Sequence, residues 1–198
     1  MINQEDYDVI IAVEVPGKSR EGLLSAHRYT VARTFINMLS HISKDQTIQY
    51  ILTIVDDILS EDKSRVVIFQ EYSRKHKESM WSPFLNLLTR PDAFIVNMTA
   101  RIVAKLACWT REPMEGSDLT YYLTWLKDQL RTPSNEYLRS VGRCLQMMLR
   151  RRGVPRDLLP TRRSRHSHSG PWVREAQFSN SVPADFLSLG HDFQPSYR

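Results

Sequence analysis

Apolar side chains recur at helical spacing through almost all of residues 1–150, and no stretch there alternates apolar and polar residues as a strand would. The pattern is clearest in one continuous stripe made of Ile48, Ile51, Leu52, Val55, Ile58 and Leu59. Gln49, Thr53, Asp56 and Asp57 lie off this stripe, so the segment is amphipathic. The first 150 residues are therefore predicted to be all-α.

The predicted helices are about 10–20 residues long, and short breaks containing proline, glycine or capping residues separate them. They are Gln4–Val13, Arg20–Leu39, a helix that carries the stripe from Ile48 to Leu59, Ser64–Tyr72, a short segment from Pro83, Ala93–Trp109, Leu119–Leu130 and Tyr137–Leu149. Ser43-Lys44-Asp45-Gln46 fits a capping box that would open the third helix. Ala93–Trp109 is apolar on more than one face, which predicts burial between neighbours.

Helix pairs at intervals of about 40 residues are typical of HEAT or armadillo repeats, which build a right-handed α-solenoid. The repeat is weak in this sequence, so the spacing leaves a compact helical bundle as the alternative.

Charge divides the chain near Arg150. Residues 1–150 hold 19 basic and 18 acidic residues, whereas residues 151–198 hold eight arginines, four acids, and five of the ten prolines. The last segment is therefore predicted to be a disordered Arg/Ser/Pro-rich tail. The helical part is too evenly charged to indicate a docking patch.

Residues 1–150 contain no glycine-rich phosphate loop, nucleophile elbow or zinc-spaced Cys/His cluster. Asp56 and Asp57 are adjacent, so on a helix they point about 100° apart and cannot share a proton; a solvated helix face is the preferred interpretation. His41 is interpreted as a cation at a helix C-terminus. The prediction is no catalytic, cofactor-binding or metal site, no cofactor and no small-molecule substrate, with binding residues unknown.

Three further groups of residues have ordinary structural interpretations. The aromatic residues are expected to pack between helices rather than stack on bases; they are Trp81, Trp109, Tyr121, Tyr122 and Trp125. Cys108 and Cys144 are expected to be buried thiols in a reducing compartment. His166 and His168 have metal-like spacing, but arginine and serine flank them and no metal site is expected.

The N-terminal sequence is acidic and has no signal-peptide pattern, and no apolar run reaches the ~18–20 residues of a membrane span. We therefore expect a cytoplasmic chain that does not insert into a membrane itself.

Several segments resemble the H subunit of the vacuolar-type (V-type) proton ATPases. They are TFIN at 34–37, HISKDQTIQYILTIVDDIL at 41–59, FLNLL at 84–88, ARIVAKLACW at 100–109, MEGSDLTYY at 114–122 and CLQMMLR at 144–150. The resemblance is nearly continuous from Ala32 to Arg150 and looser before it; Met1 resembles an internal methionine of the family.

The resemblance implies a HEAT/armadillo-like solenoid and a non-catalytic regulatory subunit of the peripheral cytosolic sector. Such a subunit supports coupling of ATP hydrolysis to proton transport and organelle acidification. Its partners would be other ATPase subunits, chiefly the peripheral stalk, on the cytosolic face of vacuolar, endosomal or lysosomal membranes. In the family, the N-terminal solenoid is associated with activation and the C-terminal domain with silencing of detached ATPase.

The resemblance ends near Arg150. Ordinary codons chosen for Gln177–Arg198 can be read from the second base as an apolar, helix-like peptide that resembles the family there. We therefore predict a one-base change of reading frame near Arg150. A solenoid interrupted at this point would expose apolar residues around Val141, Leu145 and Met148 and would be marginally stable.

Two other binding roles are compatible with the sequence. The chain could be a generic armadillo-like adaptor for peptides or trafficking proteins. The basic tail could bind nucleic acid through phosphates, but it lacks interleaved aromatic residues and no nucleic-acid partner is expected.

Overall fold

The computed structural model describes residues 4–114, 116–132 and 135–150, and within them every regular element is helical. In chain order the elements are α1 (Gln4–Glu14), α2 (Lys18–Ala26), α3 (Arg28–His41), α4 (Asp45–Glu61), η1 (Lys63–Val66), α5 (Val67–His76), α6 (Ser82–Leu85), η2 (Asn86–Thr89), α7 (Ala93–Trp109), α8 (Gly116–Arg131) and α9 (Leu138–Arg150). The η elements are 3₁₀ turns. The predicted tail, its change of reading frame, His166 and His168 all lie outside the described residues.

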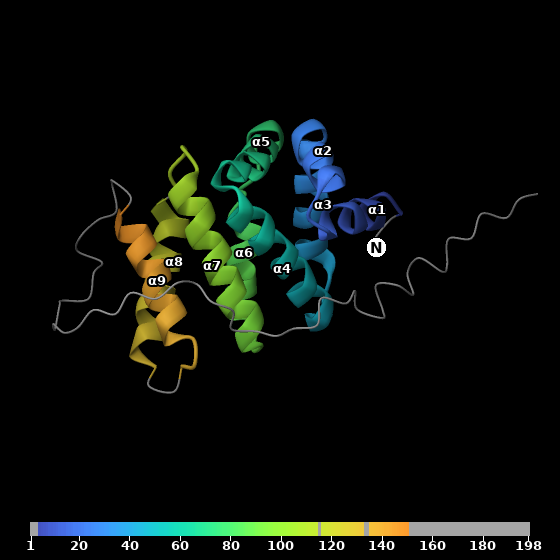
Figure 1. Cartoon of the computed structure of the whole chain (residues 1–198). Helices are drawn as coiled ribbons and strands as arrows, with labels where there is room; N and C mark the ends of the chain where they lie inside the picture. Colours follow the sequence, from blue (N-terminus) through green and yellow to red (C-terminus); the bar gives the residue numbers. More distant parts are fainter. Residues whose placement is uncertain (1–3, 115, 133–134, 151–198) are drawn as a thin grey trace, which may run out of the picture.

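The helices follow one another in a row from α1 at one end to α8 and α9 at the other (Figure 1). Helix α7 lies in the middle of an inner layer, with α4 packed on one side of it and α9 on the other. Helix α5 packs on α3, and α8 packs on α9. Since successive helices stack along one direction, the architecture is an all-α solenoid, as predicted.

One continuous apolar core runs through this row and includes buried residues from both of its ends, such as Val9 on α1 and Met148 on α9. The stripe on α4 is buried along its whole length, because it faces both α3 and α7. The predicted multi-sided burial of α7 is also confirmed. Its alanines at 100, 104 and 107 are essentially inaccessible, and such small side chains let neighbouring helices approach closely.

The predicted single helix Arg20–Leu39 is wrong, because the chain bends at His27 between α2 and α3. The His27 backbone N–H still donates to Leu23 O, but its φ/ψ of −124°/36° are not helical. Leu24 on α2 and Phe35 on α3 are both buried, so the helices on each side of the bend both contribute to the core. Before α2, Gly17 turns the chain with φ of 152°, a conformation that favours glycine.

The predicted capping box is also wrong. Lys44 occupies the N-cap position of α4 and no side chain caps the helix there. Ser43 is exposed, and its carbonyl oxygen accepts a hydrogen bond from Arg90. Arg90, which lies between η2 and α7, also pairs with Asp45 in the first turn of α4 at 2.8 Å and so fixes this end of the helix.

The apolar surface expected around Val141, Leu145 and Met148 lies elsewhere. Val141 and Met148 are buried and Leu145 is half-buried, because α9 packs on both α7 and α8. The large apolar side chains exposed near this end of the stack are Tyr121, Leu138 and Leu149.

Candidate functional site

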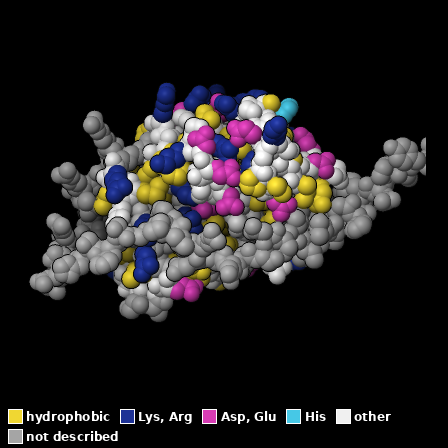
Figure 2. Space-filling model, viewed as in Figure 1, with side chains coloured by type: hydrophobic (Ala, Val, Ile, Leu, Met, Phe, Trp, Pro, Cys, Tyr) yellow, Lys and Arg dark blue, Asp and Glu magenta, His cyan; other side chains and the backbone are white. Residues whose placement is uncertain are grey.

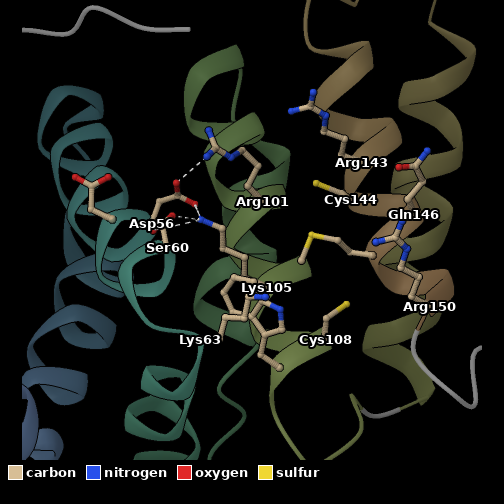
Figure 3. A pocket seen from close by; sticks show the side chains of 13 residues that line it. Asp56, Ser60, Lys63, Arg101, Lys105, Cys108, Arg143, Cys144, Gln146 and Arg150 are labelled. Atoms are coloured by element: carbon tan, nitrogen blue, oxygen red, sulfur yellow. Dashed lines mark hydrogen bonds and ion pairs between the residues drawn. The ribbon is translucent and has the colours of Figure 1, made fainter. Parts of the chain in front are cut away.

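Helices α4, α7 and α9, with the adjoining η1 turn, form an open groove of about 910 Å³, which we call the charged groove. Helix α7 supplies the floor, and α4 and α9 supply the walls (Figure 3). The lining residues are Asp56, Asp57, Ser60, Lys63, Arg101, Lys105, Cys108, Trp109, Arg143, Cys144, Gln146, Met147 and Arg150. Within each helix they recur three or four residues apart, which places them on one face.

Asp56 is the electrostatic centre of the groove. Its side chain is only 6% exposed, and it accepts hydrogen bonds from Arg101 at 2.8 Å and from Lys105 Nζ at 2.5 Å. Lys105 also donates to Ser60 Oγ at 2.7 Å and to the Asp56 carbonyl oxygen at 3.2 Å. These contacts tie α4 to α7. Burial is the largest influence on Lys105 and lowers its pKa, although Asp56 acts in the opposite direction.

The interpretation of Asp56 and Asp57 as a solvated face is therefore half wrong. Asp57 is exposed, but Asp56 is buried between two cations. Partial burial and, next, the neighbouring Asp56 carboxylate raise the pKa of Asp57 above its ordinary value. The partners of Asp56 lie 45 and 49 residues away, so no local spacing could reveal them.

The α9 wall carries basic and apolar side chains together. Arg143 and Met147 are half-buried and Arg150 is exposed, and all three line the groove. At the opposite corner Lys63 lies 5.6 Å from the centre of the Trp109 ring. Figure 2 shows basic side chains toward the α8–α9 side of the visible described surface and acidic side chains over its middle. The helical part is evenly charged overall, but five cations and two acids gather in this groove.

Both cysteines line the groove and neither forms a disulfide. Cys144 is buried as predicted, and burial raises its pKa to about 12, which keeps the thiol protonated and unreactive at neutral pH. Cys108 is only half-buried, so the prediction holds for one of the two thiols.

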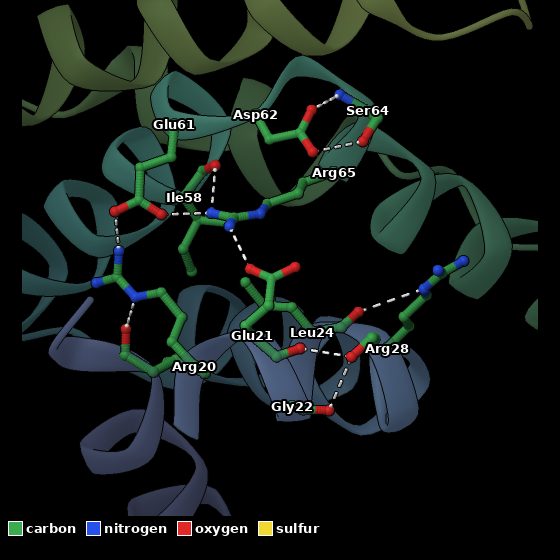
Figure 4. A network of polar contacts seen from close by, with 12 residues as sticks. Arg20, Glu21, Gly22, Leu24, Arg28, Ile58, Glu61, Asp62, Ser64 and Arg65 are labelled. Atoms are coloured by element: carbon green, nitrogen blue, oxygen red, sulfur yellow. Dashed lines mark hydrogen bonds and ion pairs between the residues drawn. The ribbon is translucent and has the colours of Figure 1, made fainter. Parts of the chain in front are cut away.

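A second polar network joins α1, α2 and the end of α4 (Figure 4). Arg20 is 2% exposed and donates to Val13 O at 2.6 Å, Glu14 O at 2.5 Å and the Glu61 carboxylate at 2.6 Å. Arg65 holds the other oxygen of Glu61 and also pairs with Glu21 at 2.7 Å. This network fixes how α1 and α2 sit on α4.

The predicted packing role holds for four of the five aromatic residues. Trp81 and Tyr122 are buried, and Trp109 and Trp125 are half-buried against the core. The prediction is wrong for Tyr121, which is exposed. Tyr122 donates its hydroxyl to Ala100 O at 2.6 Å, and burial raises its pKa. His41 is the last residue of α3, as predicted, and its Nδ1 lies 2.9 Å from Asn37 O.

Two kinds of feature are absent from the described residues. They contain no group of three or more His, Cys, Asp or Glu side chains able to hold a metal ion. Among the helices described, none is both long and apolar enough to cross a membrane. In chemical terms the charged groove offers ion pairing and apolar contact, which are the means of a binding surface.

Comparisons with known proteins identify the family of this chain. A profile of the V-ATPase H-subunit family matches residues 1–156. The chain is 55% identical over 150 residues to the V-type proton ATPase H subunit of Drosophila melanogaster, a match covering 76% of this chain and 31% of that protein. It is 43% identical over 155 residues to a probable V-type proton ATPase H subunit (form 2) of Caenorhabditis elegans, covering 76% and 33%.

The similarity extends beyond animals. A probable V-type proton ATPase H subunit of rice is 27% identical over 159 residues, covering 70% of this chain and 35% of that protein. The chain spans about a third of the length of these curated relatives. The family profile covers more than three quarters of the chain, including every described helix, so the chain belongs to the V-ATPase H-subunit family.

Proposed function

We propose that the chain acts as a non-catalytic regulatory and structural subunit of a V-type proton ATPase. The observation that carries this proposal is the 55% identity over 150 residues to the Drosophila protein, a match long enough to take in the helical stack. The stack itself supports it, because a solenoid presents extended helix faces suited to protein–protein contact. The chain would act by holding other subunits in position while they hydrolyse ATP and move protons.

The chief partner would be the peripheral stalk of the complex, and the chain would lie on the cytosolic face of vacuolar, endosomal or lysosomal membranes. Attachment would come through the complex rather than through a membrane segment of the chain itself. The domain organisation proposed with this role is a helical unit over 1–150 followed by an Arg/Ser/Pro-rich segment over 151–198, whose reading frame differs from that of the family.

Affinity capture from cells tests the assignment to the complex. The full chain, carrying an affinity tag, should retain the peripheral-stalk subunits through washing, and the tag alone should not. Capture of adaptor or trafficking proteins without any ATPase subunit would overturn the proposal and favour the adaptor alternative.

A functional assay tests the regulatory role. Membranes depleted of their own H subunit should be given the purified full chain, with ATP hydrolysis and proton uptake measured in the same sample. The expected result is more protons moved per ATP hydrolysed. No change in that ratio, despite binding of the chain to the membranes, would contradict the coupling role.

A further inference from the structure

The charged groove differs from the rest of the stack in the balance of its charges. Helices α4 and α9 both pack on α7, and between these two walls the polar face of α7 stays open to solvent. Elsewhere, charged side chains of different elements form ion pairs with each other, as Arg20 does with Glu61 and Arg65 with Glu21. In the groove, Asp56 pairs with Arg101 and Lys105, and the lining residues comprise five cations and two acids.

The charge is unevenly distributed along the groove. Arg143 and Arg150 lie one above the other on α9, two helical turns apart, and Lys63 lies at the α4 corner. Among the described residues, Arg150 forms no hydrogen bond or ion pair. The lining acids, Asp56 and Asp57, are both on α4. An anionic ligand would therefore be held on the α9 side and steered away from Asp57.

Apolar surface lies between these cations. Met147 and Trp109 are half-buried against the core and still line the groove, as does Cys108. A single phosphate or carboxylate is bound by donors that converge on one point. Cations spread over three helices with apolar side chains between them fit an elongated, amphipathic anion instead.

We infer that the charged groove binds an acidic peptide segment that carries a large apolar side chain. Acidic side chains would pair with Arg143, Arg150 and Lys63, and the apolar side chain would lie on Met147 and Trp109. Packed helices lie about 8–10 Å apart, so the groove spans about 20 Å from α4 to α9. An extended segment of about six residues covers that distance. Assembly into an ATPase is not required for this binding.

Fluorescence anisotropy of the full chain tests the inference. The probe is a fluorescein-labelled peptide with central leucines flanked by glutamates and aspartates, and a matched peptide has serines in place of the leucines. The leucine peptide should bind more tightly than the serine peptide, and salt should weaken both. No binding of either peptide at low salt would overturn the inference.

A charge-reversal pair locates the site. Arg143→Glu with Arg150→Glu should weaken binding of the leucine peptide about tenfold or more, because each attraction becomes a repulsion. The matched control, Lys18→Glu with Arg131→Glu, makes the same total charge change at exposed positions outside the groove. Equal weakening by the control pair would show attraction by net charge alone and would contradict a site in the groove.

Two further measurements keep the test independent of folding. Far-UV circular dichroism should show the same melting behaviour for both charge-reversal pairs. Lys63→Glu provides a second, exposed groove variant if the first pair unfolds.

Met147→Ser tests the apolar contact. It should weaken binding of the leucine peptide and leave binding of the serine peptide unchanged. Inositol hexakisphosphate, a compact polyanion, is the competing probe. If it binds wild type more tightly than the leucine peptide does, and binds the Met147→Ser variant as tightly as wild type, the groove is a site for compact polyanions and the inference is overturned.

Discussion

Asp56 and Asp57 are neighbours in sequence, yet their surroundings are opposite. Asp56 is buried between Arg101 and Lys105, and Asp57 is exposed on the next position of the helix. Asp56→Asn should therefore destabilise the fold by about 3 kcal/mol, because Lys105 loses its counter-charge while remaining largely buried. Urea unfolding at pH 7 measures the change. A loss below about 0.5 kcal/mol would mean that solvent reaches this pair freely.

Asp57 gives the matched control, and its raised pKa predicts how the effect of its substitution depends on pH. The charged groups around it are Asp56, Arg20, Glu61 and Lys105, and its pKa in the folded chain is raised above the ordinary 3.8. The folded chain thus holds this proton more tightly than the unfolded chain, and ionised Asp57 lowers stability above the folded-state pKa. Asp57→Asn should be at least as stable as wild type at pH 7, with an advantage that shrinks as pH falls toward 3.8. An advantage that grows on acidification would contradict this sign.

Arg20 is the residue on which the position of the first two helices depends. Removing it leaves the Val13 and Glu14 carbonyl oxygens without this donor, and Glu61 keeps only Arg65. Arg20→Ala should lower the free energy of unfolding by about 3 kcal/mol. Arg74→Ala is the control, since Arg74 and its partner Glu112 are both exposed, and about 0.5 kcal/mol or less is expected there. Similar losses for the two variants in urea unfolding would show that the buried contacts of Arg20 are not special.

The sequence predicts little of the candidate site, for a physical reason. Arg101 and Lys105 are separated from Asp56 by more than forty residues, and only the stacking of α7 on α4 brings them together. The even charge of residues 1–150 hides the groove, because the acids that balance its cations lie on other faces. Helix positions, by contrast, are local properties, and the apolar spacing gives α1, α4, α7 and α9 within a few residues.

At the scale of a helix, a local sequence pattern does not identify which residue caps the helix N-terminus. Ser43 fits a capping pattern but does not cap α4, whereas Asp92 does cap α7. One Asp92 oxygen accepts from Ile95 N at 2.8 Å and the other from Gln49 Nε2 at 2.8 Å. The Asp92 side chain is therefore held in place partly by its hydrogen bond with Gln49 of helix α4. A four-residue sequence pattern carries no information about such a tertiary contact.

The two caps give a paired prediction. Asp92→Ala should destabilise the chain by about 1–2 kcal/mol, because it removes both the cap of α7 and a contact with α4. Ser43→Ala should change stability by less than about 0.5 kcal/mol, because Ser43 is exposed and caps nothing. Thermal or urea unfolding of both variants decides the matter. A loss of about 1 kcal/mol on Ser43→Ala would restore the capping box in solution.

At the scale of the whole molecule, a solenoid has no single centre, and its stability is a sum of neighbour contacts along the row. Helix α7 is covered by α4, α6, η1, η2 and α9, whereas α1 is in contact chiefly with α2 and α3. The far end is better closed than the sequence suggests, because α9 buries Val141 and Met148 against α7 and α8. The middle of the row should therefore be the last part to open.

Hydrogen–deuterium exchange on the full chain, followed by mass spectrometry, measures this order. Amides of α4 and α7 should exchange slowest, since they open only with most of the stack, and those of α1 and α8 should exchange sooner through local opening. Arg20→Ala should speed exchange in α1 and α2 while leaving α9 unchanged, because the lost contacts all lie at one end of the row. If that variant speeds exchange equally in α1 and α9, the stack unfolds as one cooperative unit and the nearest-neighbour description is wrong for this chain.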